Sequence, residues 1–356
     1  MNITLPKYIS GEYAVGTECF TVIDSERKEV LGSDNGNRKI AVRMYYPVSK
    51  EMIDGMERAD IFTERKMHAL QKAYHIKSVQ DEFKKADFYG NAPHVEGIKF
   101  PLVIYNHGYN AYVEANTFLC CELASNGYVV ASVGHAYEAI LNEYEDGTYD
   151  VYDKKINKMM YDNVVATLFD QMRLLKAKGT KEEVYQKFDA FQRKHTRYIM
   201  DRVTEWGRDT MCVVRELKER YADWIDFSKG IGATGHSMGG ATAYYLCHHE
   251  AEIACGINID GGVFGDYEGM VMKKPFLQIC CAENYNVETR PLFGTDAPVE
   301  CEVFEDMKHI GFTDAKFFAP SKILVGKLDA NIMFERLASC HLRFLDKYLK
   351  ESNRNG

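Results

Sequence analysis

The run GHSMGG at residues 235–240 is the feature that most constrains the fold of this 356-residue chain. Residues 229–234 before it have the apolar character of a buried strand, and residues 241–248 after it have the pattern of a helix. A Gly-x-Ser-x-Gly sequence at such a junction predicts a sharp strand-to-helix turn that presents the serine hydroxyl, because the glycines let the helix approach the strand. The alternative is a glycine-rich turn with an incidental serine. The flanking elements favour the first interpretation, so Ser237 is the candidate nucleophile.

Short apolar runs recur along the chain, and each is separated from the next by a segment that can be helical. They lie at residues 100–105, 127–133, 230–234, 255–259 and 275–281. Strands that are apolar on both faces and alternate with helices predict an α/β fold with a mostly parallel central sheet flanked by helices. Residues 18–24 and 38–47 predict an antiparallel start to the sheet, joined through a turn at residues 32–37.

Two stretches interrupt this alternation. Residues 50–97 are charged and predict helix and loop on the surface. Residues 137–221 are too long for an ordinary connection and show helical spacing, which predicts a helical insertion into a single domain spanning residues 1–356. A lid over the active site and a set of plain packing helices are equal alternatives for this insertion.

Composition excludes several classes of function. The chain carries 44 Lys and Arg against 52 Asp and Glu, a net charge of −8, which gives no electrostatic reason to bind nucleic acid. It has no apolar run as long as a membrane span and no N-terminal stretch that resembles a secretion signal. Its ten cysteines include no Cys-x-x-Cys pair, and no dinucleotide- or phosphate-binding glycine motif follows a strand. We therefore expect a cytoplasmic enzyme that acts on a small molecule, with reduced thiols and without a metal or cofactor.

A serine becomes nucleophilic when a histidine takes its proton and a carboxylate orients that histidine. In hydrolases with this serine turn the histidine comes last in the chain, which leaves His248, His249, His309 and His341 as candidates. The first two lie on the helix that leaves the turn, and His341 lies within an amphipathic C-terminal helix. His309 lies in a loop after the strand-like residues 301–305, so we predict that it is the base.

Three carboxylates are candidates for the acid: Asp260, Glu283 and Asp296. Asp260 and Glu283 end two successive strands after the serine turn, whereas Asp296 lies further along in a loop. The C-terminal ends of parallel strands line the crevice in which open α/β sheets bind ligands. Position alone therefore admits both Asp260 and Glu283.

Acyl transfer through a serine also needs two backbone N–H groups that stabilise the developing oxyanion. We expect one donor from Met238, which follows the nucleophile, and the other from Tyr109, which lies in the loop after the strand at residues 101–105.

These segments resemble the platelet-activating factor acetylhydrolase family of serine-dependent α/β-hydrolases, in its plasma and intracellular type II branch. The resemblance covers residues 100–318 and rests on blocks at residues 101–108, 122–131, 235–240, 259–264 and 307–314. It implies the α/β-hydrolase fold and a Ser-His-Asp triad. In that family the acid lies at the end of the strand after the serine turn, which favours Asp260, 260 − 237 = 23 residues after Ser237, over Glu283.

The resulting hypothesis is a carboxylic-ester hydrolase of the EC 3.1.1 class that uses Ser237, His309 and Asp260 on short-acyl, acetyl-type esters. Phospholipid-like esters, and hence lipid degradation, are a further possibility that the resemblance implies. The alternatives are a serine peptidase of the same fold and a non-catalytic homologue that binds a small ligand or a partner. We also expect apolar side chains of the insertion to roof a bounded pocket: Tyr144, Tyr149, Tyr152, Met159, Met160, Phe169, Phe188 and Phe191.

Overall fold

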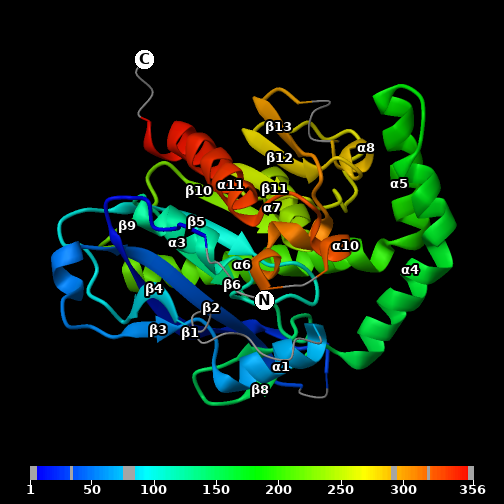
Figure 1. The fold of residues 1–356 in the computed structure, drawn as a ribbon. Helices are drawn as coiled ribbons and strands as arrows, with labels where there is room; N and C mark the ends of the chain where they lie inside the picture. Colours follow the sequence, from blue (N-terminus) through cyan, green and yellow to red (C-terminus); the bar gives the residue numbers. More distant parts are fainter. Residues whose placement is uncertain (1–5, 33–34, 75–84, 290–294, 319–320, 352–356) are drawn as a thin grey trace.

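The computed structural model describes residues 6–32, 35–74, 85–289, 295–318 and 321–351. Its centre is one large mixed sheet with the strand order β13-β12-β11-β10-β5-β6-β2-β1-β4-β3, and a short strand, β9, pairs with β5 (Figure 1). The strands are β1 Ala14–Lys28, β2 Asn37–Val48, β3 Arg58–Asp60, β4 Lys85–Gly90, β5 Phe100–Asn106, β6 Val129–Val133, β9 Ile225–Asp226, β10 Ile231–His236, β11 Ile253–Ile259, β12 Phe276–Cys281 and β13 Val299–Phe304. The short strands β7 Asn142–Glu143 and β8 Tyr149–Asp150 form a separate pair.

The predicted mostly parallel sheet with an antiparallel start is confirmed. From β6 to β13 all neighbouring strands are parallel, whereas β1 and β2 are antiparallel to each other and β2 is antiparallel to β6. The parallel strands β5, β6, β10, β11 and β12 are almost entirely buried because helices cover both of their faces, whereas the edge strand β13 is partly exposed. Their C-terminal ends therefore meet at one edge, where the loops after β5, β10, β11 and β13 lie together.

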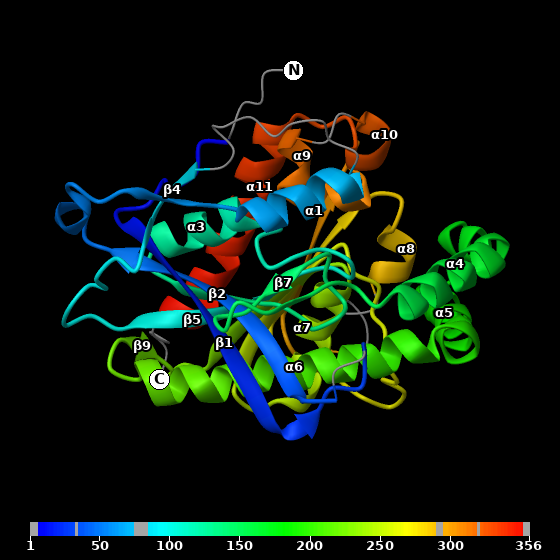
Figure 2. The same cartoon turned by 90° about the horizontal axis from the view of Figure 1, so that it is seen from below.

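Helices lie on both faces of the sheet (Figure 2). The longer ones are α1 Glu64–Tyr74, α3 Thr117–Ser125, α4 Lys154–Leu175, α5 Lys181–His195, α6 Arg197–Tyr221, α7 Met238–His249 and α11 Ala330–Leu345. The short ones are η1 Lys50–Ile53, α8 Tyr285–Glu288, η3 His309–Phe312, α9 Ala315–Phe318, α10 Lys322–Val325 and η4 Asp346–Lys350. One core cluster joins α3 and α11 to one face of the sheet, and a second joins α6 and α7 to the other face.

The prediction of helix and loop for residues 50–97 is wrong in part. This stretch contains α1, but it also contains β3 and β4, and β4 extends the sheet by pairing in parallel with β1. Ala86 and Phe88 of β4 are fully buried, and the Phe88 ring packs edge-on against Tyr45. The strand was missed because only two apolar side chains, separated by one residue, mark it within a charged tract.

The insertion consists of two parts with different surroundings. Helix α6 belongs to the core, since its Val213, Val214 and Leu217 are fully buried against the sheet. Helices α4 and α5 instead form a pair at one side of the molecule (Figure 1). Of the 22 residues of α4, only Thr167 and Leu174 are buried. Residues 137–221 therefore contain both a helix that packs in the core, α6, and a peripheral pair of helices, α4 and α5.

Candidate active site

Ser237 lies at the turn between β10 and α7, where the sequence predicted a strained junction. Its backbone has φ 58° and ψ −121°, a left-handed conformation that non-glycine residues rarely adopt. Gly239 allows the helix to pass close to β5, because a Cβ atom there would lie 2.0 Å from the carbonyl oxygen of Asn106. The turn leaves Ser237 half-buried, with its hydroxyl facing a neighbouring loop.

His309 lies between Ser237 and Asp260 and contacts both. Its Nε2 atom is 2.9 Å from Ser237 Oγ, and its Nδ1 atom is 2.8 Å from Asp260 Oδ2. A proton on Nδ1 satisfies the carboxylate and leaves Nε2 to accept the proton of the serine hydroxyl. The Asp260 side chain is fully buried, while the His309 side chain is 38% exposed. The arrangement can therefore pass a proton from Ser237 to an imidazole that a buried carboxylate orients.

Backbone and side-chain donors hold Asp260 in place. Its Oδ1 atom accepts a hydrogen bond of 2.6 Å from the Cys281 N–H, and its Oδ2 atom accepts one of 3.0 Å from Asn284 Nδ2. Burial raises the pKa of Asp260, but the hydrogen bond and charge of His309, together with the Cys281 N–H, outweigh burial and lower the pKa below its ordinary value. Asp260 is therefore ionised at neutral pH, as the partner of an imidazolium must be.

The structure does not bring the other candidate acids and bases to Ser237. Glu283 is exposed and forms an ion pair with Lys308, and no contact joins it to His309. Asp296 lies near Met272, to whose carbonyl oxygen its N–H donates. The remaining candidate bases lie on helices: His248 and His249 are on α7, and His341 is buried in α11. His341 bonds to the Leu337 carbonyl oxygen and to Thr234 Oγ1, which is a packing role.

The loop after β5 lies against the nucleophile, as the predicted oxyanion geometry requires. A Cβ atom added to Gly108 would be 3.1 Å from the Cβ atom of Ser237, so the backbone before Tyr109 passes directly beside the serine. Met238 is the first residue of α7, where backbone N–H groups point out of the helix end. Met238 belongs to one core cluster with the fully buried Trp206 of α6, and Tyr109 packs against that cluster.

Two residues beside the triad were not predicted from the sequence. His236 Nε2 donates a hydrogen bond of 2.9 Å to the His309 carbonyl oxygen, and burial, followed by the charge of His309, lowers the pKa of His236 to about 3. Glu288 is buried next to Asp260, and burial together with that carboxylate holds the pKa of Glu288 well above its ordinary value. His236 occupies a variable position of the serine motif, and Glu288 lies 288 − 260 = 28 residues from its partner, so no local pattern marks either.

The insertion contacts the loops around this site, and of the side chains that were expected to roof it Phe188 does so, with its ring centroid 6.2 Å from that of Phe264. Gln192 of α5 bonds to the Val263 carbonyl oxygen and the Gly265 N–H, in the loop that follows Asp260. The side chains of Tyr149, Met159 and Phe169 are 55%, 41% and 83% exposed. The expectation that these three take part in roofing a bounded pocket is therefore wrong, because they face solvent.

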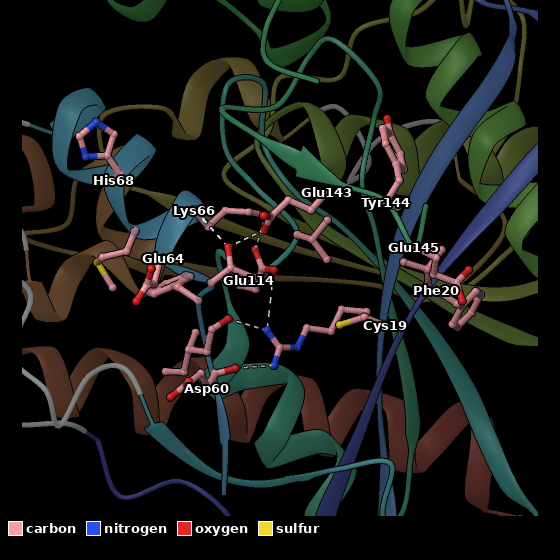
Figure 3. A pocket seen from close by; sticks show the side chains of 18 of the residues that line it. Cys19, Phe20, Asp60, Glu64, Lys66, His68, Glu114, Glu143, Tyr144 and Glu145 are labelled. Atoms are coloured by element: carbon pink, nitrogen blue, oxygen red, sulfur yellow. Dashed lines mark hydrogen bonds and ion pairs between the residues drawn. The ribbon is translucent and has the colours of Figure 1, made fainter. Parts of the chain in front are cut away.

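A separate cavity of about 750 Å³ lies between β1, β2 and the start of α1 (Figure 3). Arg43, Lys66 and Glu114 form a nearly buried ion cluster in its wall. Ser237, Asp260 and His309 do not line this cavity, so the cavity is not part of the candidate active site.

Among the described residues, no group of three or more His, Cys, Asp and Glu side chains is arranged to hold a metal ion. Within the same described ranges, every helix is too short or too polar to cross a membrane.

Comparisons with known proteins agree on a family and a fold. The family described as "Platelet-activating factor acetylhydrolase, isoform II" matches residues 2–355. The platelet-activating factor acetylhydrolase of Cavia porcellus is 25% identical over 271 residues, which are 73% of this chain and 60% of the relative. That of Gallus gallus is 25% identical over 279 residues, 73% of this chain and 64% of the relative. This chain thus spans roughly three fifths of the length of these curated relatives.

Among solved structures, a ferulic acid esterase from Streptomyces cinnamoneus superimposes with a TM-score of 0.72 at 20% sequence identity, over 98% of this chain and 93% of that chain. The acylaminoacyl peptidase of Pyrococcus horikoshii gives a TM-score of 0.51 at 12% identity, over 96% of this chain and 43% of that one. At such identities the likeness concerns the fold alone. The predicted α/β-hydrolase fold is confirmed.

Proposed function

Because the chain belongs to the platelet-activating factor acetylhydrolase family, isoform II, we propose that it is a serine-dependent hydrolase of carboxylic esters. The observation that carries the proposal is the position of His309, within hydrogen-bond distance of Ser237 Oγ on one side and of the buried Asp260 carboxylate on the other. A nucleophile, a base and an orienting carboxylate in this order are the requirements of acyl transfer through serine.

In the first half-reaction Ser237 Oγ attacks the ester carbonyl carbon while His309 Nε2 accepts the hydroxyl proton. The carbonyl oxygen becomes an oxyanion, for which the N–H groups of Met238 and Tyr109 are the proposed donors. Asp260 stabilises the imidazolium through Nδ1. The tetrahedral intermediate collapses, the bond to the alcohol oxygen breaks, and His309 returns the proton to the leaving alcohol.

In the second half-reaction water attacks the acyl group on Ser237. His309 now takes a proton from water and then gives it to Ser237 Oγ as the acyl–oxygen bond breaks. The products are a carboxylic acid and the free enzyme. Each half-reaction passes one proton to His309 and on to an oxygen atom, so His309 ends each half-reaction in its starting protonation state.

Short-acyl, acetyl-type esters are the substrates that we propose. The side chains next to the nucleophile support this choice, because Met238, Trp206 and Val203 form a packed cluster that Tyr109 and Phe264 extend. A close-packed wall limits how long an acyl chain can be, because additional methylene groups find no space. Phospholipid-like esters with a short acyl group are the narrower candidate class.

We further propose that residues 1–356 act as one domain with residues 137–221 as an insertion, and that α4 and α5 border the entrance to the site. The contacts of Gln192 with the loop after Asp260 support this position. All ten cysteines are free thiols, which supports a reducing, cytoplasmic compartment.

The proposal is tested by hydrolysis of p-nitrophenyl acetate by the wild type and by Ser237→Ala, with the melting temperature of both as the folding control. We expect turnover by the wild type and a loss of about 10⁴-fold or more in the variant, because the triad acts as a unit. A folded wild type that cleaves no ester, or that cleaves peptide anilides in preference to esters, contradicts the proposal. The first result would favour a non-catalytic binding protein and the second a peptidase.

A further inference from the structure

We propose that Glu138, in the loop after β6, is a positioning residue that sets the shape of the loop carrying Tyr109. The inference rests on the ester hydrolysis proposed above and deepens it, since it names the residue that aligns the second oxyanion donor. Glu138 has no exposed surface, although glutamate is rarely buried without a specific partner.

Two backbone hydrogen bonds join the loop of Glu138 to the loop of Tyr109. The Asn110 N–H donates to the Glu138 carbonyl oxygen at 2.9 Å, and the Ile140 N–H donates to the Ala111 carbonyl oxygen at 2.8 Å. Asn110 has a left-handed φ of 57°, so the chain reverses immediately after Tyr109. The direction of the Tyr109 N–H therefore depends on where the backbone of Glu138 lies.

The side chain of Glu138 fixes that backbone to α6. Arg202 donates to both of its carboxylate oxygens, through Nε at 2.8 Å and Nη2 at 2.5 Å. Trp206 Nε1 donates to Oε2 at 2.9 Å. Three donors on one helix hold the carboxylate in a single position and orientation. Because only three rotatable bonds separate the carboxylate from the backbone, they also restrict the position of the Glu138 carbonyl oxygen, which the Asn110 N–H holds from the other side.

The same helix supports the other oxyanion donor. Trp206 and Met238 belong to one core cluster, against which Tyr109 packs, and the Trp206 ring stacks on His135 with centroids 3.7 Å apart and an interplanar angle of 9°. Helix α6 is thus a common reference for both proposed N–H donors. A fixed relation between two donors is what preorganised stabilisation of an oxyanion requires.

The competing interpretation is that Glu138 only stabilises the fold, as part of the buried ion network around Arg38. Glu29 provides a matched control within that network. It is buried, its Oε2 atom accepts a hydrogen bond of 2.8 Å from Arg38 Nη1, and it holds the N–H groups of Val30 and Leu31, which lie outside the loop of Tyr109. Shortening either side chain by one methylene perturbs a buried carboxylate of the same network. Of the two residues, only Glu138 is bonded to the loop that carries Tyr109.

The experiment compares Glu138→Asp and Glu29→Asp with the wild type in kcat and KM on p-nitrophenyl acetate. It also measures the affinity of an alkyl trifluoromethyl ketone, in which Ser237 Oγ adds to the ketone carbon, the hydroxyl proton moves to His309 and the ketone oxygen becomes an oxyanion. We expect Glu138→Asp to lower kcat about tenfold or more with KM within about twofold, and to weaken ketone binding by the same factor as kcat/KM. Glu29→Asp should keep the wild-type kcat.

The inference is overturned if Glu138→Asp keeps the wild-type kcat, if its loss lies in KM alone, or if Glu29→Asp loses as much turnover. Should Glu138→Asp fail to fold, Trp206→Phe decides, since it removes the indole N–H bond to Glu138 while keeping an aromatic ring. A reduced kcat in Trp206→Phe supports the role, and a wild-type kcat contradicts it. A wild type without esterase activity refutes the proposed function and this inference together, whereas an active wild type with an unaffected Glu138→Asp refutes this inference alone.

Discussion

Asp260→Asn tests whether Asp260, and not Glu283, is the carboxylate that orients His309. The change is nearly isosteric, but the new amide has one acceptor where the carboxylate has two. In the wild type, Oδ1 accepts from the Cys281 N–H at 2.6 Å, while Oδ2 accepts from His309 Nδ1 at 2.8 Å and from Asn284. If the amide oxygen stays at the Cys281 N–H, the NH₂ group faces His309. The imidazole must then carry its proton on Nε2, where it can no longer accept the proton of Ser237.

The magnitude follows from this wrong tautomer and from the loss of charge beside the imidazolium. A comparable loss of the triad carboxylate in serine hydrolases costs about 10⁴-fold in turnover, which corresponds to about 5.4 kcal/mol at about 1.36 kcal/mol per factor of ten. Glu283→Gln is the control, because Glu283 is exposed and forms only a surface ion pair with Lys308. Such a pair contributes about 0–1 kcal/mol to stability. The turnover of Glu283→Gln should therefore stay within about threefold of the wild-type turnover.

The assay is the initial rate on p-nitrophenyl acetate for the wild type and both variants, with melting temperatures measured on the same preparations. We expect Asp260→Asn to melt within a few degrees of the wild type while its turnover collapses. The reasoning is refuted if Asp260→Asn retains more than about one tenth of the wild-type kcat, which would be less than about 1.4 kcal/mol of transition-state energy. It is equally refuted if Glu283→Gln is the more damaging change.

Three other perturbations test separate parts of the account. His236→Phe removes the N–H that holds the His309 carbonyl oxygen, so kcat should fall about tenfold. The fall should be the same at every pH from 6 to 9, because a His236 side chain with a pKa of about 3 is neutral throughout this range. An unchanged kcat would contradict a role of this hydrogen bond in placing His309. Burial raises the pKa of Glu288, so folding keeps its proton bound, and the contribution of Glu288 to wild-type stability should fall as the pH rises above about 4.3, where the unfolded chain releases that proton. The melting temperature of Glu288→Gln should therefore be higher than that of the wild type at pH 8 and equal to it near pH 4. The same difference in melting temperature at both pH values would contradict the raised pKa. Along a p-nitrophenyl series, kcat/KM should peak from acetyl to butyryl and fall by octanoyl, and a profile still rising at decanoyl would refute a bounded acyl site.

Local patterns were sufficient to predict the parallel strands β5, β6 and β10 to β13, the antiparallel start of the sheet and the serine turn. The turn at Ser237 is encoded by contiguous residues, because only glycine fits at position 239, where a Cβ atom would lie 2.0 Å from the carbonyl oxygen of Asn106. The positions of His309 and Asp260 could be predicted because parallel strands all end at one edge, so residues that follow strand ends meet there whatever their separation in sequence.

Contacts between distant segments could not be predicted in the same way. The burial of β4 depends on its pairing with β1, and its own charged surroundings conceal it. Apolar residues such as Phe169 indicate a helix, but composition does not tell which face of the helix turns to the protein. Glu138, in turn, gains its partners Arg202 and Trp206 only when α6 folds back over the loop after β6.

Labelling with a fluorophosphonate tests the central claim most directly, because the reagent forms a stable bond only with a serine whose proton is removed by a neighbouring base. We predict one label per chain, located on the peptide that contains Ser237, with none on Ser237→Ala or on the heat-denatured wild type. A folded wild type that takes up no label, or that carries the label on any other residue, contradicts the assignment of Ser237 as the nucleophile.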